Sequence, residues 1–134
     1  MNKLYGEISD ITSHEGISLV KIKTAQATMG TVVIDTPQSC DYLKIDKKIT
    51  VAFKETEVAI ALKDLGPISL SNQLTCKITH IENGKILAKI SLTCKDAKIT
   101  SIITTNSSKR LGLEVGLDII ALIKANEISL IDEE

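Results

Sequence analysis

The sequence predicts an all-β protein built from two tandem five-stranded β-barrels, each with one short helix. The main observation is an internal repeat. The segment that begins at Ile49 recurs from Ile119, 70 residues later, and Asn2-Lys3-Leu4 is matched by Asn72-Gln73-Leu74 at the same offset. The composition agrees, because 43% of the residues are hydrophobic and only 2% are aromatic. Such an aliphatic composition suits strands, and a repeat of this length indicates two small copies of one fold.

The repeat also predicts where the chain divides. We expect one domain at residues 1–64 and a second at residues 69–134, with Leu65-Gly66-Pro67 as the linker. Between the two anchors the alignment predicts a local offset of 68, with two residues gained in one loop and lost in another. The pairs that indicate this offset are Gly16 with Gly84 and Ile22 with Ile90.

In the second half, alternation of apolar and polar residues predicts a strand from Leu74 and a return strand from Ile86 to Cys94. Asn83-Gly84, between the two, is a strong signal for a two-residue hairpin turn. Three further strands are expected at residues 98–105, 117–125 and 127–131.

A short helix is expected between the third and fourth strands, at residues 106–111. Asn106 or Ser107 is the predicted N-cap, and Gly112 closes the helix.

The first half follows the same order. A short helix is predicted near residues 37–43, with Thr36 as N-cap and Pro37 in the first helical position. Five strands and one helical turn per half indicate a small, partly open barrel of the OB type. The five strands are expected near residues 3–11, 17–25, 28–35, 47–54 and 57–62.

The run Ile119-Ile120-Ala121-Leu122-Ile123 is apolar on both faces of its strand. A strand of an isolated small barrel should alternate, because one face meets water. Two interpretations stay open: burial between the two halves of one chain, and burial in a subunit interface, which we weigh more heavily.

Charge and composition exclude several classes of function. The net charge is −1 and Arg110 is the one arginine, so nothing indicates a nucleic-acid or anionic membrane partner. No apolar run approaches the roughly 20 residues that span a bilayer. We expect no resident metal ion, because no cysteine pair has metal-ligand spacing, and no enzyme, because no acid–base or nucleophile–base set appears. Cys40, Cys76 and Cys94 are expected to be reduced cytoplasmic thiols.

The second half resembles the molybdenum-pterin-binding (Mop) or molbindin family, within the wider TOBE group. The pattern spans about 60 residues in order and spacing, and the tandem arrangement is similar to di-Mop proteins. The resemblance implies a binding protein for molybdate or tungstate that assembles as a homotrimer. The residues that carry it are Asn72-Gln73-Leu74, Asn83-Gly84, residues 102–108, Leu111-Gly112-Leu113, Gly116 and residues 121–125.

A tetrahedral dianion needs hydrogen-bond donors and limited positive charge. Thr105, Ser107 and Ser108 supply hydroxyl and backbone donors at the start of the short helix. Lys124 supplies an ammonium, and the backbone N–H of Ala125 follows it. The resemblance implies ligands at Thr105, Ser108 and Lys124. The plainer alternatives are that Thr105 or Ser107 only caps the helix and that Lys124 is a solvated lysine at a strand end.

One departure from the family pattern is clear. The family carries Ser-Ala-Arg-Asn before its first strand, where Ser and Arg help to hold the anion. This chain has Ser69-Leu70-Ser71-Asn72, so the serine is kept as Ser69 and Ser71 replaces the arginine. A serine cannot supply the permanent charge of a guanidinium. In the first half, Asp35 and Pro37 disfavour an anion, so that copy is expected to be an eroded site.

We therefore expect a cytoplasmic, non-catalytic protein that binds molybdate or tungstate for storage and homeostasis. Any oxyanion should bind at a subunit or repeat interface and contact Ser69, Ser71, Thr105, Ser108 and Lys124. The assembly is expected to be a homotrimer, with a dimer as the alternative. The alternative function is a TOBE-type structural or regulatory oligomerisation module with degenerate anion sites.

Overall fold

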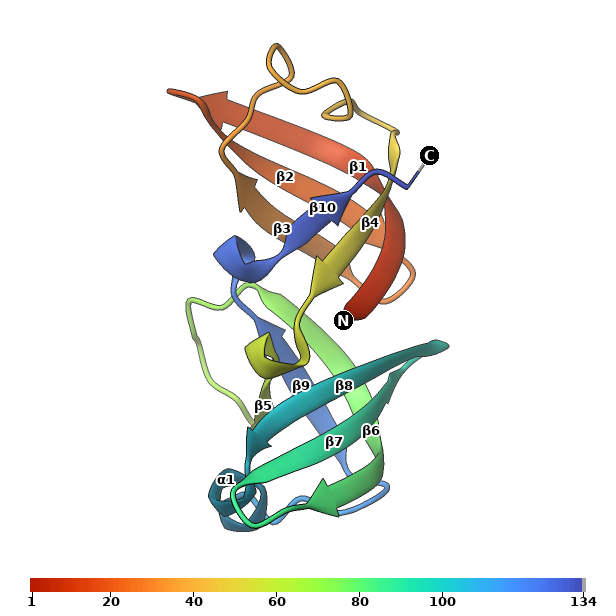
Figure 1. Cartoon of the computed structure of the whole chain (residues 1–134), viewed down its shortest axis with the longest axis vertical. Coiled ribbons are helices and arrows are strands. Elements are labelled where there is room, and N and C mark those ends of the chain that lie inside the picture. Colours follow the sequence, from red (N-terminus) through yellow and green to blue (C-terminus); the bar gives the residue numbers. More distant parts are fainter. Residues whose placement is uncertain (134) are drawn as a thin grey trace.

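Two five-stranded antiparallel sheets make up the chain, each curled into a small barrel (Figure 1). They are described by a computed structural model that covers residues 1–133. The strands are β1 (Asn2–His14), β2 (Ile17–Thr24), β3 (Thr28–Val33), β4 (Lys48–Phe53), β5 (Ala59–Leu62), β6 (Asn72–Asn83), β7 (Leu87–Cys94), β8 (Ala97–Thr104), β9 (Asp118–Ile123) and β10 (Ser129–Ile131). The helical elements are α1 (Thr105–Arg110) and two single 3₁₀ turns, η1 (Glu55–Glu57) and η2 (Ala125–Glu127).

The last strand of each repeat joins the sheet of the other repeat. The first sheet has the order β10-β4-β1-β2-β3, and the second has the order β5-β9-β6-β7-β8. Figure 1 shows β10, drawn in blue, beside β4 in the upper barrel. Residues 1–64 and 69–134 therefore each contribute four strands to one sheet and one strand to the other.

The register of the strands relates the two repeats by one constant offset of 70 residues. Val20 pairs with Ile11 in the first sheet, and Ile90 pairs with Ile81 at the equivalent place in the second. The predicted local offset of 68 is therefore wrong, and Gly84 is not the counterpart of Gly16. The offset of 68 came from matching Gly16 with Gly84, two glycines that the fold requires for different structural reasons.

Those reasons lie in the two hairpins. Glu15 and Gly16 both have positive φ angles, 51° and 80°, and form the two-residue turn between β1 and β2. Gly84 instead donates its N–H to the Leu87 carbonyl at 2.9 Å, so the tip lies two positions later than predicted, at Lys85-Ile86. A Cβ on Gly84 would lie 2.7 Å from that carbonyl oxygen. Asn83-Gly84 is thus not the turn itself, and Gly84 is required by a close backbone approach.

The helix of the second repeat forms one residue earlier than predicted. Thr104, not Asn106 or Ser107, is the N-cap, because its Oγ1 accepts the N–H of Ser107 at 3.1 Å. Gly112 follows the helix with a φ of 65°, which confirms the predicted closure.

Two short turns replace the helix predicted near residues 37–43: Ser39 and Cys40 donate to the Thr36 carbonyl, and Leu43 donates to the Cys40 carbonyl. The Ser39 hydroxyl accepts the Thr36 N–H at 2.9 Å, and such local side-chain bonds compete with helix formation.

The doubly apolar strand β9 is covered largely by its own chain. Ile119, Ala121, Leu122 and Ile123 are each at most 4% exposed, whereas Ile120 is half-buried. β9 lies between β5 and β6 in the sheet, and β5 comes from the other repeat. Burial between the two halves of one chain, the interpretation given less weight, therefore accounts for this run.

Two buried asparagines lock the barrels together. The Asn72 amide donates to the Gly30 carbonyl at 2.8 Å and accepts the Gly30 N–H at 2.7 Å. Asn2 makes the same pair with Thr100, at 2.8 Å in both directions. Gly30 and Thr100 lie on β3 and β8, the edge strands of their sheets. Each amide thus pairs with backbone groups as a neighbouring strand would, and fixes one barrel against the other.

The cysteines differ from expectation. Cys76 and Cys94 form a disulfide between β6 and β7, with their Cα atoms 4.4 Å apart, and Cys40 is the free cysteine among the described residues. The prediction of three reduced thiols is therefore wrong. Cys76 and Cys94 are 18 residues apart in the sequence, and this spacing does not show that their buried side chains face each other on neighbouring strands.

Replacing Asn72 by alanine should lower the free energy of unfolding by about 1–3 kcal/mol, because the Gly30 N–H and carbonyl lose their partner. Urea denaturation measures this change. Gln73→Ala, at the exposed neighbouring position, is the matched control and should cost much less. Equal losses in the two variants would contradict the locking role of Asn72.

Thiol titration in denaturant, without reductant, should find one reactive thiol per chain, and three after reduction. Cys40→Ser should reduce the first value to zero. Three thiols in the unreduced protein would show that Cys76 and Cys94 are not joined.

Candidate functional site

Four of the predicted site residues lie at the waist between the barrels. Asn72 pairs with Ile123 at the end of the β6–β9 ladder, so Ser71 and Lys124 are the next residues at that end. Ala125 begins η2, and Ser69 lies just ahead of Ser71 in the chain. Ser69, Ser71 and Lys124 are exposed, and Ala125 is half-buried. This waist set, Ser69, Ser71, Lys124 and Ala125, offers hydroxyls, one ammonium and backbone N–H groups to solvent.

The other three predicted residues form a separate helix set, Thr105, Ser107 and Ser108, on α1. Thr105 and Ser108 are buried, whereas Ser107 is half-buried. The Thr105 hydroxyl donates to the Gly84 carbonyl at 2.7 Å, so its proton is already engaged. Ser107 Oγ instead accepts from Thr104 Oγ1 at 3.0 Å. Ser107 can therefore donate its own proton outward.

A charged donor lies beside Ser107. The Arg110 guanidinium donates to Ser107 Oγ at 3.4 Å. Residues three positions apart meet on a helix surface, and this spacing is the sequence signal that brings Arg110 to the helix set. Sequence reasoning did not assign Arg110 to the site, although the family arginine is absent at Ser71.

The two sets lie at opposite ends of the second barrel. β6 runs from Asn72 at the waist to Asn83, and the Thr105 N–H bonds to the Ile86 carbonyl in the loop beyond that far end. Figure 1 shows α1 at the foot of the lower barrel, away from the junction with the upper barrel. An N–H···O hydrogen bond usually spans about 2.7–3.2 Å, far less than the length of β6. One small anion cannot contact both sets in a single chain.

The first repeat carries carboxylates where the second has neutral groups. The constant offset makes Asp35 the counterpart of Thr105, and Glu55 the counterpart of Ala125. Glu55 accepts a hydrogen bond from the Met1 α-ammonium at 2.9 Å, and this bond lowers the pKa of its half-buried carboxyl. The Lys54 N–H donates to Glu57 Oε1 at 2.9 Å. Negative charge at these positions disfavours an anion.

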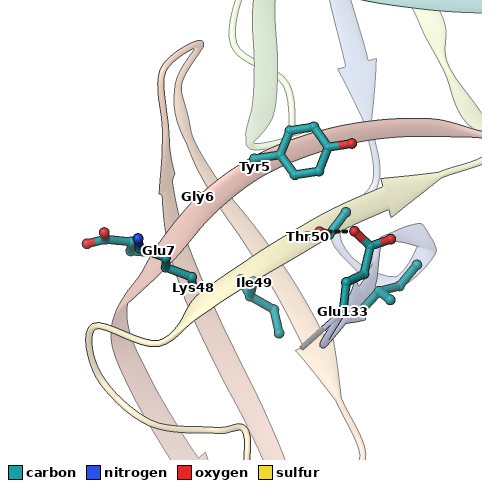
Figure 2. Close-up of a pocket in the computed structure, with 8 residues that line it drawn as sticks. Tyr5, Gly6, Glu7, Lys48, Ile49, Thr50 and Glu133 are labelled. Atoms are coloured by element: carbon teal, nitrogen blue, oxygen red, sulfur yellow. Dashed lines mark hydrogen bonds between the residues drawn. The ribbon is translucent and has the colours of Figure 1, made fainter.

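A cleft of about 430 Å³ lies on the first barrel, away from both sets (Figure 2). Glu133 reaches into it and accepts hydrogen bonds from Lys3 Nζ at 2.8 Å and Thr50 Oγ1 at 3.2 Å. The bond from Lys3 lowers the pKa of Glu133, so this side chain is a carboxylate at neutral pH. Glu133 and Glu7 make the cleft unsuitable for an oxyanion. Its lining is Tyr5, Gly6, Glu7, Lys48, Ile49, Thr50, Ile131 and Glu133.

Within residues 1–133, no three His, Cys, Asp or Glu side chains gather as a group that could hold a metal ion. In the same part of the chain, no helix is long and apolar enough to cross a membrane. The donors of the waist and helix sets are hydroxyl, ammonium, guanidinium and amide groups, which suit an anion rather than a cation.

Comparison with known proteins identifies related sequences. The TOBE domain model matches residues 68–130. The chain is 35% identical over 65 residues to molybdenum-pterin-binding protein 1 of Clostridium pasteurianum, which covers 48% of this chain and 96% of that protein. It is also 35% identical over 60 residues to molybdenum-pterin-binding protein MopA of Rhodobacter capsulatus. That match covers 44% of this chain but only 23% of MopA.

A solved structure resembles the chain over nearly its whole length. The cytoplasmic molybdate-binding protein ModG, in a crystal form with molybdate bound, aligns with a TM-score of 0.88 and 26% identity. The alignment covers 96% of this chain and 94% of that one. The likeness therefore includes both repeats and their arrangement.

Proposed function

We propose that this chain, which belongs to the family of molybdenum-pterin-binding (Mop) proteins, is a non-catalytic cytoplasmic protein that binds molybdate for storage and homeostasis. The observation that carries the proposal is the full-length likeness to ModG, a protein whose structure holds molybdate. Tungstate, a dianion of nearly the same size, is expected to bind in the same way.

The chemistry of the second repeat supports this role. Lys124 contributes a flexible point charge, and exposed serines contribute hydroxyl protons. Ser107 and Arg110 add a hydroxyl and a guanidinium on α1. Thr105, buried and bonded to Gly84, supports the helix set from within rather than supplying a free proton.

A second copy of the chain is expected to complete the site. The waist set and the helix set lie too far apart to meet in one chain, so each would contribute part of a shell around an anion between protomers. Exposed aliphatic side chains on the outer face of β2 and β3 also favour assembly, since Leu19 and Val32 face each other there, each about 40% exposed. We propose a homotrimer, with a dimer as the alternative.

A structural or regulatory module of the TOBE type is the second candidate function. The observations that favour it are the serine at position 71, where the family has arginine, and the carboxylates of the first repeat. In this alternative the chain assembles but binds no oxyanion. Calorimetric titration with molybdate, tungstate, sulfate and phosphate separates the two functions.

Lys124→Ala should weaken molybdate binding by about one to two decades in Kd, because a charged hydrogen bond contributes roughly 1.5–3 kcal/mol. Lys54→Ala, at the equivalent position of the first repeat, is the matched control and should change the Kd little. Ser71→Arg should tighten binding by restoring a guanidinium. If the wild-type chain gives no heat at millimolar ligand and Ser71→Arg creates none, the module function takes the place of storage.

Light scattering at micromolar concentration should give a mass of three 14.5 kDa chains. Two chains would support the dimer. A monomer that binds molybdate with full affinity would refute a site shared between copies.

A further inference from the structure

A buried hydroxyl of the first repeat reaches across to the second repeat. Thr31, on β3, has no exposed surface. Its Oγ1 lies 2.8 Å from the Ile128 carbonyl oxygen and 3.1 Å from the Ala125 carbonyl oxygen. A hydroxyl has one proton, so the two carbonyls share it, with the shorter contact to Ile128. Thr31 thereby joins β3 to both ends of the η2 turn.

The η2 turn has little support of its own. It begins directly after Lys124, and no side chain caps it. Its internal bonds are Glu127 N–H to the Lys124 carbonyl at 3.0 Å and a long one, Ile128 N–H to the Ala125 carbonyl, at 3.5 Å. The equivalent turn of the first repeat has one side-chain bond in addition, in which Glu57 Oε1 accepts the Lys54 N–H at 2.9 Å. The conformation of η2 therefore depends on Thr31 more than the conformation of η1 depends on Ser101, the residue equivalent to Thr31.

Gly30, the residue before Thr31 on β3, holds the segment that carries Ser71 of the waist set. Gly30 makes the bidentate pair with Asn72, the residue that follows Ser71. Two successive residues of β3, Gly30 and Thr31, thus fix the segments that carry Ser71 and Lys124.

We propose that Thr31 is a positioning residue for oxyanion binding by the second repeat, an inference that rests on the proposed function. The Thr31 hydroxyl sets the η2 turn, and the turn sets the direction of Lys124 and the Ala125 N–H. The first repeat, whose own copy of the site carries Asp35 and Glu55, contributes to affinity by preorganising the second. A preorganised site binds more tightly because less ordering is needed on binding.

The pseudo-symmetry of the chain supplies a matched control. Ser101, at the position equivalent to Thr31, is fully buried on β8 and donates to the Val58 carbonyl at 2.7 Å. That bond holds the η1 turn after Lys54, where no oxyanion is expected. Loss of the Ser101 hydroxyl should reduce stability as loss of the Thr31 hydroxyl does, without an effect on the ligand.

The test compares full-length Thr31→Val, Thr31→Ser and Ser101→Ala by molybdate calorimetry and thermal unfolding. Thr31→Val, which keeps the side-chain shape, should raise the Kd for molybdate about three- to tenfold. Thr31→Ser should restore it to near the wild-type value, and Ser101→Ala should leave it unchanged. Both hydroxyl-deleting variants should lower the Tm.

Amide hydrogen exchange of the wild-type chain gives a second readout that requires no variant to fold. Added molybdate should slow exchange of the amides of residues 125–128 and leave those of residues 55–58 unchanged. Equal slowing in both segments would overturn the inference.

The remaining outcomes separate the two proposals. If the wild type binds molybdate and Thr31→Val binds equally well, the positioning role is wrong and the storage function stands. If Thr31→Val and Ser101→Ala weaken binding to the same extent, Thr31 has only a structural role. If the wild type does not bind, the proposed function fails, and the inference with it.

Discussion

Each sheet of this chain is completed by a strand from the opposite repeat, and the remaining features depend on this exchange. β10 and β5 are short, yet each pairs with a buried central strand, β4 or β9. The turns that precede them, η2 and η1, must therefore cross from one barrel to the other. The amides of Asn2 and Asn72 bind the edge strands at the same junction. Backbone hydrogen bonds to both barrels therefore fix the waist, and the side chains at the waist keep a fixed position relative to each barrel.

Much of the fold was predictable because a strand with one buried face leaves a period-two pattern. That pattern identified the strands, and the 70-residue repeat identified two copies. The strand exchange was not predictable, because the three residues of β10 do not indicate which sheet the strand joins. The glycine alignment failed because Gly16 serves a positive φ angle whereas Gly84 allows a close approach of the Leu87 carbonyl.

The candidate site was predictable in its residue types but not in its arrangement. Hydroxyls near α1 and a lysine after β9 are visible in the sequence. Their separation depends on where β6 begins and ends, and the sequence does not show that the donors lie at opposite ends of the barrel. Thr31 was missed because a buried threonine in an alternating strand looks like an ordinary core position. Its role follows from the carbonyls it meets, which are more than 90 residues away along the chain.

The strand exchange has a consequence for biosynthesis. During translation, β1 to β4 emerge before β10, the edge strand beside β4, which is made only after β5 to β9. Until then the outer edge of β4 offers unpaired N–H and carbonyl groups, which is the kind of edge that pairs with other chains. The first sheet can be completed only after β10 has been synthesised and has paired with β4. The N-terminal sheet therefore waits for a strand from the second repeat, and contacts of such long sequence separation slow this closing step.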